Sequence, residues 1–271
     1  ELKTRISNRL LELGIEFNIN EMFLGTFHCI CLRIIEDYRE YPRLKRSFVL
    51  MDQFDQQYFL YQNLNDFRQI DNVDQILGSD KTPVWAKSEN LLQWINKVTE
   101  EAIDHQRLIE SNDEALIALG ECYDLYQRKL DEHNALDFST IQLEALNLLR
   151  NHSVVLELLK DRIQYLMIDE YQDTNTIQEM ILKLLMGDGQ NLCVVGDDDQ
   201  ALYRFRGATI RNILQYPDNF EDGKCKQIEL ITNYRSHPDI IHFYNKWMSD
   251  QVWEVNNQKY RYDKQIKPRD E

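Results

Sequence analysis

The sequence contains no apolar stretch that approaches the roughly 18 to 20 residues that a membrane-spanning helix needs. It also has no signal peptide, because Glu1 opens directly into the charged segment "ELKTRISNRL". These two absences predict a soluble protein of the cytoplasm with no membrane partner. The first residue is not Met, which suggests that the chain is a piece of a longer protein.

No two cysteines form a C-x-x-C motif, although the chain contains five cysteines in 271 residues. Most of them lie in apolar runs, which favours free, buried thiols over disulfides or a zinc site. Such thiols fit a reducing cytoplasm. The five residues are Cys29, Cys31, Cys122, Cys193 and Cys225.

Basic residues are scarce relative to acidic ones, with 31 Lys and Arg against 46 Asp and Glu and a net charge of −15. This balance argues against a protein that holds duplex DNA mainly through a basic surface. It does not exclude nucleic acid, because aromatic stacking and a few local cations can hold a single strand. Hydrophobic residues make up 43% of the chain, which is enough for the core of one large domain or two modest ones.

The first part of the chain has the apolar spacing that is typical of helices. Apolar residues at helical spacing in "ELKTRISNRLLELG" predict a helix that stops at Gly14. The segment "MFLGTFHCICLRII" predicts a brief strand, a Gly-Thr turn, and a helix that begins near Phe27 with Thr26 as its cap.

The region from about Tyr41 to Ala135 is almost free of glycine and predicts a helical subdomain. Its only clear internal break is "LGSDKTP", residues 77–83. Four of its apolar residues fit one helical face: Leu91, Trp94, Ile95 and Val98.

The rest of the chain alternates between strands and helices after "LDFSTIQLEALNLL", a helix that Asp137 can cap. Strands are expected at 165–168, 192–195 and 227–231, and the helices that follow them at about 176–185, 208–214 and 238–248. This order indicates an α/β fold, a parallel sheet with covering helices. Ligands of such sheets collect at the C-terminal ends of the strands.

An unusual polar segment follows each expected strand: "IDEYQDTN", "VVGDDDQALYRFRGA" and "LITNYRSHPDII". We expect the three to converge on one crevice. A carboxylate pair, a Gln beside acidic residues and a Tyr-Arg dipeptide suit the binding of a metal, the sensing of water or a γ-phosphate, and the stabilisation of transferred charge. The pair Asp169 and Glu170, taken alone, could instead cap the next helix.

These segments resemble motifs II, III and IV of the superfamily 1A DNA helicases, the UvrD/Rep/PcrA group. "GTFHCICLRII" and "LDFSTIQLEALNLL" are also similar to segments of that group, and the match runs from Glu1 to about Met248. The resemblance implies a RecA-like parallel sheet with covering helices, an incomplete P-loop NTPase fold, and an inserted all-helical subdomain. The implied parts are domain 1A at 1–41 and 136–248, subdomain 1B at 42–135, and the start of domain 2A or a polar tail at 249–271. Residues 42–135 match only in length, position and helical character.

The resemblance also implies roles in nucleotide chemistry. Asp169 would be the Mg²⁺-associated carboxylate and Glu170 the catalytic base. Gln200 would contact the γ-phosphate, Tyr234 would stack on adenine, and Arg235 would act as an arginine finger. Gln200 could otherwise be an ordinary loop amide, and Arg235 could pair with a structural carboxylate.

Six residues are implied to contact single-stranded DNA: Thr26, Phe27, His28, Tyr203, Phe205 and Arg206. Tyr203 and Phe205 would stack on bases, and Phe205 stands where relatives often carry Trp. The two rings could instead be core residues, because residues two apart on an extended segment share a face. His28 could simply form a hydrogen bond within domain 1A.

One departure from the family pattern concerns the phosphate-binding loop. The sequence does not contain G-x-x-x-x-G-K-[ST], and the nearest segment, "DGKCK", lacks the upstream Gly and the Ser or Thr. We therefore expect this chain to hold only part of the catalytic site and to be inactive alone.

The resemblance implies that the chain is a fragment of an ATP-dependent 3′-5′ DNA helicase of repair or replication. The parent would use ATP and Mg²⁺, translocate on single-stranded DNA, unwind duplexes at single/double-strand junctions, and work with repair or replication proteins. Two alternatives are a helicase-nuclease subunit of the AddA or RecB type and an ATPase-dead scaffold that binds partners through 1B.

Overall fold

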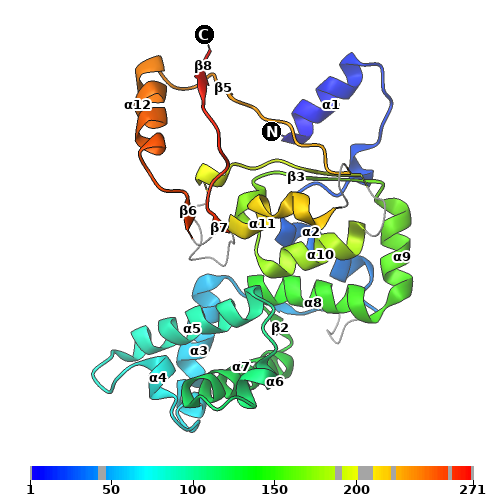
Figure 1. Cartoon of the computed structure of the whole chain (residues 1–271). Coiled ribbons are helices and arrows are strands. Elements are labelled where there is room, and N and C mark those ends of the chain that lie inside the picture. Colours follow the sequence, from blue (N-terminus) through cyan, green and yellow to red (C-terminus); the bar gives the residue numbers. More distant parts are fainter. Residues whose placement is uncertain are drawn as a thin grey trace. The chain divides into compact units, whose positions relative to one another are not determined.

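The computed structural model describes residues 2–41, 47–186, 191–200, 210–220, 224–255 and 258–269. The chain forms two compact units (Figure 1). The first contains residues 1–163 and 180–187, and the second contains residues 164–179 and 188–271. In the described part of the chain, no helix is both long and apolar enough to cross a membrane.

The first unit begins with the helix α1 (Leu2–Glu12), the short η1 (Ile19–Glu21) and the helix α2 (Phe27–Asp37). Both expected helices are confirmed. Thr26 caps α2, because its Oγ1 accepts a hydrogen bond from the backbone nitrogen of Cys29 over 3.4 Å.

The strand expected just before Gly25 is wrong. Residues 22–24 form no ladder with another described segment and pack against α2 instead. The guanidinium of Arg33 donates to the carbonyl of Met22 over 3.1 Å and lies 4.4 Å from the centre of the Phe23 ring. Arg33 of α2 therefore contacts Met22 and Phe23, where a neighbouring strand was expected to pair.

A bundle of helices with its own core follows. A cluster of buried apolar side chains runs from Met51 to Ala135. The two ends of the bundle are joined by a parallel pair of short strands, β1 and β2. Its elements are β1 (Val49–Leu50), α3 (Gln53–Phe67), α4 (Asp74–Leu77), α5 (Val84–Glu100), α6 (His105–Ile109), α7 (Glu114–His133) and β2 (Ala135–Leu136). The expected helical character is confirmed.

The expectation of a single internal break is wrong, since each of the five helices is followed by its own turn. Asp52 and Asp113 accept backbone hydrogen bonds at helix starts, so local capping divides the region. Trp94 was also misplaced: it is 43% exposed, and Leu92 completes the buried face of α5 in its stead.

Helices α8 (Phe138–Asn151) and α9 (Ser153–Arg162) complete most of the first unit. The predicted cap Asp137 is confirmed: its carboxylate accepts from the backbone nitrogen of Thr140 over 2.8 Å. It also accepts from the Tyr126 hydroxyl over 2.5 Å and from Gln56 over 3.0 Å. Burial raises the pKa of Asp137, although the hydrogen bonds from Tyr126 and Thr140 act to lower that pKa.

The second unit contains two neighbouring parallel strands, β3 (Tyr165–Ile168) and β4 (Asn191–Val194), paired in register from Tyr165 with Asn191 to Ile168 with Val194. Both expected strands are confirmed. The helix α10 (Thr176–Met186) lies between them in sequence and crosses the division of the two units. The elements that follow β4 are η3 (Asp198–Gln200), α11 (Ile210–Leu214), η5 (Tyr216–Asn219), β5 (Thr232–Asn233), α12 (Pro238–Ser249), β6 (Glu254–Val255), β7 (Gln258–Lys259) and β8 (Lys267–Pro268).

The third strand expected at 227–231 is wrong. Regular pairing starts at Thr232, and β5 pairs in parallel with β8 rather than with β4. The preceding segment is exposed, as the 84% exposure of Leu230 shows. The side chain of Asn245 in α12 holds β8 by bonding both backbone groups of Ile266, over 2.7 and 3.1 Å. The described fold is thus mixed α/β with short two-stranded sheets, three of them parallel.

All five cysteines are free, as expected. Burial holds only for Cys31 and Cys122, where it raises the pKa of each thiol to about 12. Cys29 and Cys193 are exposed, so the expectation that most thiols would be buried is wrong.

Candidate nucleotide site

The carboxylate pair Asp169 and Glu170 follows β3 directly, and both side chains are exposed. Oδ1 of Asp169 accepts from the backbone nitrogen of Glu170 over 3.0 Å. Glu170 lies in the left-handed region at φ 52° and ψ 44°, a conformation that few residues other than glycine adopt. Such backbone strain clusters at functional sites.

Capping of the next helix falls to another residue. Oδ1 of Asn175 accepts from the backbone nitrogen of Gln178 at the start of α10, over 3.0 Å. The side chain of Gln178 reaches back to the backbone nitrogen of Asn175 over 3.3 Å. The exposed carboxylates of Asp169 and Glu170 therefore do not cap α10.

Gln172 joins the first polar segment to the second. It is 1% exposed, and its Nε2 donates to Oε2 of Glu170 over 2.6 Å. Its Oε1 accepts from the backbone nitrogen of Asp197 over 3.0 Å. Gln172 was not predicted from the sequence, where its one signal is its place in "DEYQD", two residues after Glu170.

The second polar segment is an acidic turn, which we define as Asp197, Asp198 and Asp199, and Gln200 follows it. Nε2 of Gln200 donates to Oδ2 of Asp197 over 2.9 Å. The backbone nitrogen of Gln200 donates to the carbonyl of Asp197 over the same distance. Gln200 is nevertheless exposed, so part of its side chain is available to a ligand.

Two cations contact the acidic turn. Nζ of Lys264 lies 2.6 Å from Asp197 and 3.1 Å from Asp199, and it also contacts Asp198. Nε and Nη2 of Arg261 donate to the two carboxylate oxygens of Asp199, over 2.7 and 3.2 Å. One carboxylate oxygen of each of the three residues lies within 4.8 Å of the others, a spacing that could suit a metal ion, but the ammonium of Lys264 contacts all three.

These contacts set the charge state of the turn. Burial acts to raise the pKa of Asp197, but hydrogen bonds from Lys264 and Gln200 outweigh it and lower that pKa. Burial likewise opposes ionisation of Asp199, whose pKa is lowered by Arg261, by the Tyr244 hydroxyl and by Lys264. Both carboxylates are therefore charged at neutral pH.

The third polar segment is held by Asn233. Its Oδ1 accepts from the backbone nitrogens of Arg235 and Ser236, over 2.8 and 2.9 Å. This turn leaves Tyr234 74% exposed and Arg235 exposed as well. A cleft of ≈390 Å³ separates this segment from the acidic turn, and its lining includes Gln200 and Asn233.

The structure connects the three segments in pairs. Gln172 joins the first to the second by hydrogen bonds. Residues of the second and third segments line one cleft, and Tyr244 of α12 donates a hydrogen bond to Asp199. Asp169, Glu170, Tyr234 and Arg235 are not among the described residues that line the cleft.

The expected DNA contacts Thr26, Phe27 and His28 lie in the first unit. The side-chain nitrogen of Gln142 donates to Nε2 of His28 over 2.8 Å, and the His28 ring meets the edge of Phe138. Burial lowers the pKa of His28. The residue therefore has an internal partner on α8. Tyr203, Phe205 and Arg206 lie outside the described residues.

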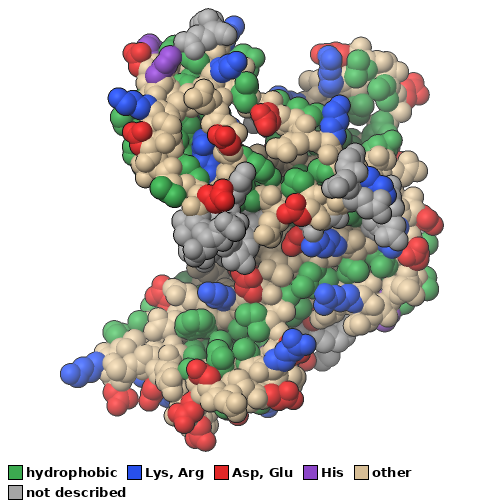
Figure 2. Space-filling view, in the orientation of Figure 1, with side chains coloured by type: hydrophobic (Ala, Val, Ile, Leu, Met, Phe, Trp, Pro, Cys, Tyr) green, Lys and Arg blue, Asp and Glu red, His purple; other side chains and the backbone are tan. Residues whose placement is uncertain are grey.

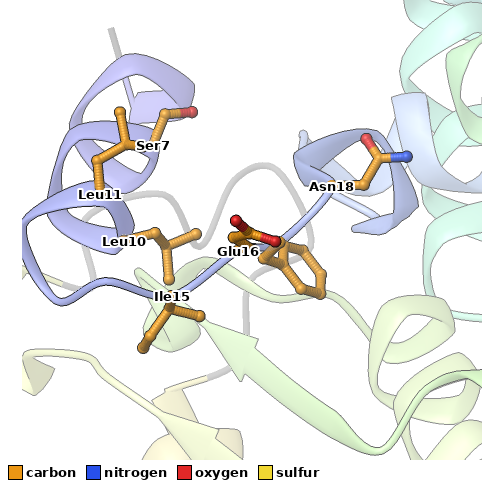
Figure 3. A pocket seen from close by; sticks show the side chains of 7 residues that line it. Ser7, Leu10, Leu11, Ile15, Glu16 and Asn18 are labelled. Carbon is orange, nitrogen blue, oxygen red and sulfur yellow. The ribbon is translucent and has the colours of Figure 1, made fainter.

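Basic side chains do not gather into one patch on the face shown in Figure 2, where they are scattered among acidic ones. A separate hollow of ≈560 Å³ lies beside α1 (Figure 3). Apolar side chains such as Leu10, Leu11 and Ile15 line much of it, and none of the expected site residues that the structure describes does.

The chain is similar to known DNA helicases. The family model of the UvrD/REP helicase N-terminal domain matches residues 1–221. The ATP-dependent DNA helicase PcrA of Staphylococcus epidermidis is 32% identical over 283 residues, which cover 100% of this chain and 36% of that protein. PcrA of Staphylococcus aureus is 31% identical over 262 residues, covering 92% of this chain and 34% of that protein. The chain thus spans about a third of the length of the curated relatives it matches. Because the family model matches well over half of its length, the chain belongs to the UvrD/REP helicase family.

Proposed function

We propose that the chain is part of an ATP-dependent DNA helicase of superfamily 1A that moves 3′ to 5′ on single-stranded DNA and opens junctions. Residues 1–41 and 136–248 supply most of a RecA-like motor domain, residues 42–135 are an inserted 1B subdomain, and residues 249–271 are the start of domain 2A or a polar tail. The observation that carries the proposal is the link through Gln172 between Glu170 and the turn that presents Gln200.

Asp169 suits Mg²⁺. Its carboxylate is exposed at the end of β3, and the hydrogen bond from Glu170 occupies only Oδ1. Mg²⁺ in phosphoryl-transfer sites is commonly held by one or two carboxylates, phosphate oxygens and water. When bound, the ion neutralises charge on the phosphates.

Glu170 accepts the proton of the attacking water, since its carboxylate is exposed and oriented by Gln172. Gln200 contacts the γ-phosphate with the exposed part of its amide. Arg235 donates to the phosphoryl oxygens, and the ring of Tyr234 stacks on adenine. Both side chains are exposed beyond the Asn233 turn, as contact with a ligand requires.

The DNA path uses Thr26, Phe27 and His28 together with Tyr203, Phe205 and Arg206. Stacking on aromatic rings holds single strands without a strongly basic surface, in keeping with a net charge of −15.

The test uses the full-length gene product that contains this chain. We expect ATP hydrolysis that rises with single-stranded DNA and unwinding of a duplex with a 3′ tail in preference to a 5′ tail. Glu170→Gln should abolish hydrolysis and keep ATP binding, because the amide retains the shape and loses the base. Glu89→Gln, an exposed change in α5, is the matched control. Loss of nucleotide binding together with turnover would make Glu170 structural, and absence of unwinding would refute the helicase assignment.

A further inference from the structure

Arg261 and Lys264 lie outside every segment that predicted the nucleotide site. They belong to the stretch between β7 and β8, more than 60 residues after the acidic turn in sequence. They nevertheless provide the cations that contact all three carboxylates of that turn. The backbone nitrogen of Tyr262, between them, also donates to Asp198 over 2.6 Å.

These contacts differ from ordinary surface ion pairs, which contribute little because water screens them. The Arg261 side chain is 7% exposed and its partner Asp199 is 12% exposed. Lys264 is 16% exposed and Asp198 is 2% exposed. Arg261 binds through two parallel hydrogen bonds, a geometry that fixes orientation as well as distance. Removal of either cation would leave carboxylates that are screened from water without a counter-charge.

The acidic turn is connected to the proposed catalytic groups through a series of hydrogen bonds. Asp197 accepts from Lys264 on Oδ1 and from Gln200 on Oδ2. The backbone nitrogen of Asp197 donates to Gln172, which donates in turn to Glu170. Asp197 therefore connects Lys264 with Gln200 through its carboxylate and with Glu170 through its backbone nitrogen and Gln172.

We propose that Arg261 and Lys264 are positioning residues: they hold the acidic turn so that Gln200 and, through Gln172, Glu170 keep the orientation that hydrolysis needs. Both cations are engaged with carboxylates of the turn. The catalytic part of the inference rests on the proposed function, whereas the hydrogen-bond relay from Lys264 to Gln172 and Gln200 is a property of the chain itself.

The relay is tested first in the 271-residue chain, without any assay of activity. The side-chain amide signals of Gln172 and Gln200 are followed in ¹⁵N-edited NMR spectra, with their assignments made from Gln172→Ala and Gln200→Ala. In Lys264→Met both signals should shift and their amide protons should exchange faster with solvent. Lys246→Met, an exposed change in α12, should leave them in place. Unchanged signals in Lys264→Met would overturn the relay.

The catalytic consequence is tested in the full-length gene product. Lys264→Met should lower kcat for ATP hydrolysis about 10- to 100-fold, the scale of misplacing a positioned group, while KM for ATP changes less than about threefold. Lys264→Arg should recover most of the rate, because it restores a cation to the turn. Assays are run well below the Tm of each variant, so that the enzyme is folded. The Tm itself is measured separately.

A double-mutant cycle supplies the decisive comparison. Because part of the effect of Lys264 passes through Gln172 and part through Gln200, Gln172→Ala combined with Lys264→Met should lower kcat by less than the product of the two single effects. Multiplying effects, or a lower Tm with kcat unchanged, would overturn the positioning role. A full-length wild type with no ATPase activity would instead refute the proposed function. The NMR test of the hydrogen-bond relay does not depend on that outcome.

Discussion

Gln172 donates a hydrogen bond from Nε2 to Oε2 of Glu170 over 2.6 Å. Glu170 lies at a positive φ of 52°, so its side chain leaves the backbone in a direction that a regular strand end would not provide. Gln172 is fixed in turn by burial and by the backbone nitrogen of Asp197. The proposed base is thus oriented by the segment that follows the neighbouring strand, and the site is sensitive to changes well away from the carboxylate.

Gly196 is one such position. A Cβ added there would lie 2.7 Å from Oε1 of Gln172 and 2.7 Å from Cδ1 of Ile213, closer than real Cβ contacts come. We expect Gly196→Ala to lower the free energy of unfolding by about 1 to 3 kcal/mol, the usual cost of overpacking. Urea unfolding of the chain measures this loss.

The control for Gly196→Ala is the double variant with Gln172→Ala. Truncating Gln172 removes one of the two close contacts, so the double variant should lose less stability than the sum of the two single changes. Strict additivity would show that the new methyl group does not act through Gln172.

The acidic turn predicts a loss of stability in acid. The pKa values of Asp197 and Asp199 are lowered in the folded chain, so in the window below about 3.9 the unfolded chain binds more protons than the folded one. The stabilisation is present above that pH and is lost as pH falls through the lower folded values. Urea midpoints should therefore drop below about pH 4, and Asp199→Asn should make the drop shallower. The exposed change Asp80→Asn should leave it unaltered, and an equally steep drop in Asp199→Asn would contradict the assignment.

Local signals in the sequence were enough to locate several elements. Thr26 and Asp137 each act on the backbone three residues later, so a short segment contains both partners of the cap. The apolar runs of β3 and β4 likewise need only their own residues and the turns that bound them. The carboxylates Asp169 and Glu170 were found for the same reason, as polar residues at the end of a strand.

Partners distant in sequence could not be predicted in this way. The pairing of β5 with β8 joins Thr232 to Lys267, and the apolar pattern of neither segment predicts the other as its partner. The two cations of the acidic turn, Arg261 and Lys264, looked like part of a polar tail because their burial depends on the folded turn. Gln172 was missed since its hydrogen bonds follow from the left-handed turn at Glu170, which the sequence does not reveal.

Tyr126 provides a test of the helical bundle and its junction with α8. Tyr126→Phe removes the hydroxyl that donates to Oδ2 of the buried Asp137 carboxylate. Among the described contacts, Gln56 is then the remaining side-chain donor to that oxygen. We expect a loss of about 1 to 3 kcal/mol in the free energy of unfolding, since a buried hydrogen-bond acceptor loses a partner. Tyr58→Phe, on the exposed side of α3, should change it by less than about 0.5 kcal/mol. Equal effects of the two changes would show that the hydroxyl of Tyr126 contributes little.

The final prediction separates stacking from charge in the proposed DNA path. In the full-length gene product, Tyr203→Ala combined with Phe205→Ala should weaken binding of a fluorescent single-stranded oligonucleotide, because each stacked base contributes about 1 to 3 kcal/mol. ATP hydrolysis without DNA should stay near wild type, and unwinding should fall. The slope of log affinity against log salt concentration should hardly change, since no phosphate contact is removed. Arg206→Ala is the comparison, as loss of a phosphate contact reduces that slope by about 1. Unchanged affinity together with a large drop in Tm would show that the two rings belong to the core, and the stacking role would then fail.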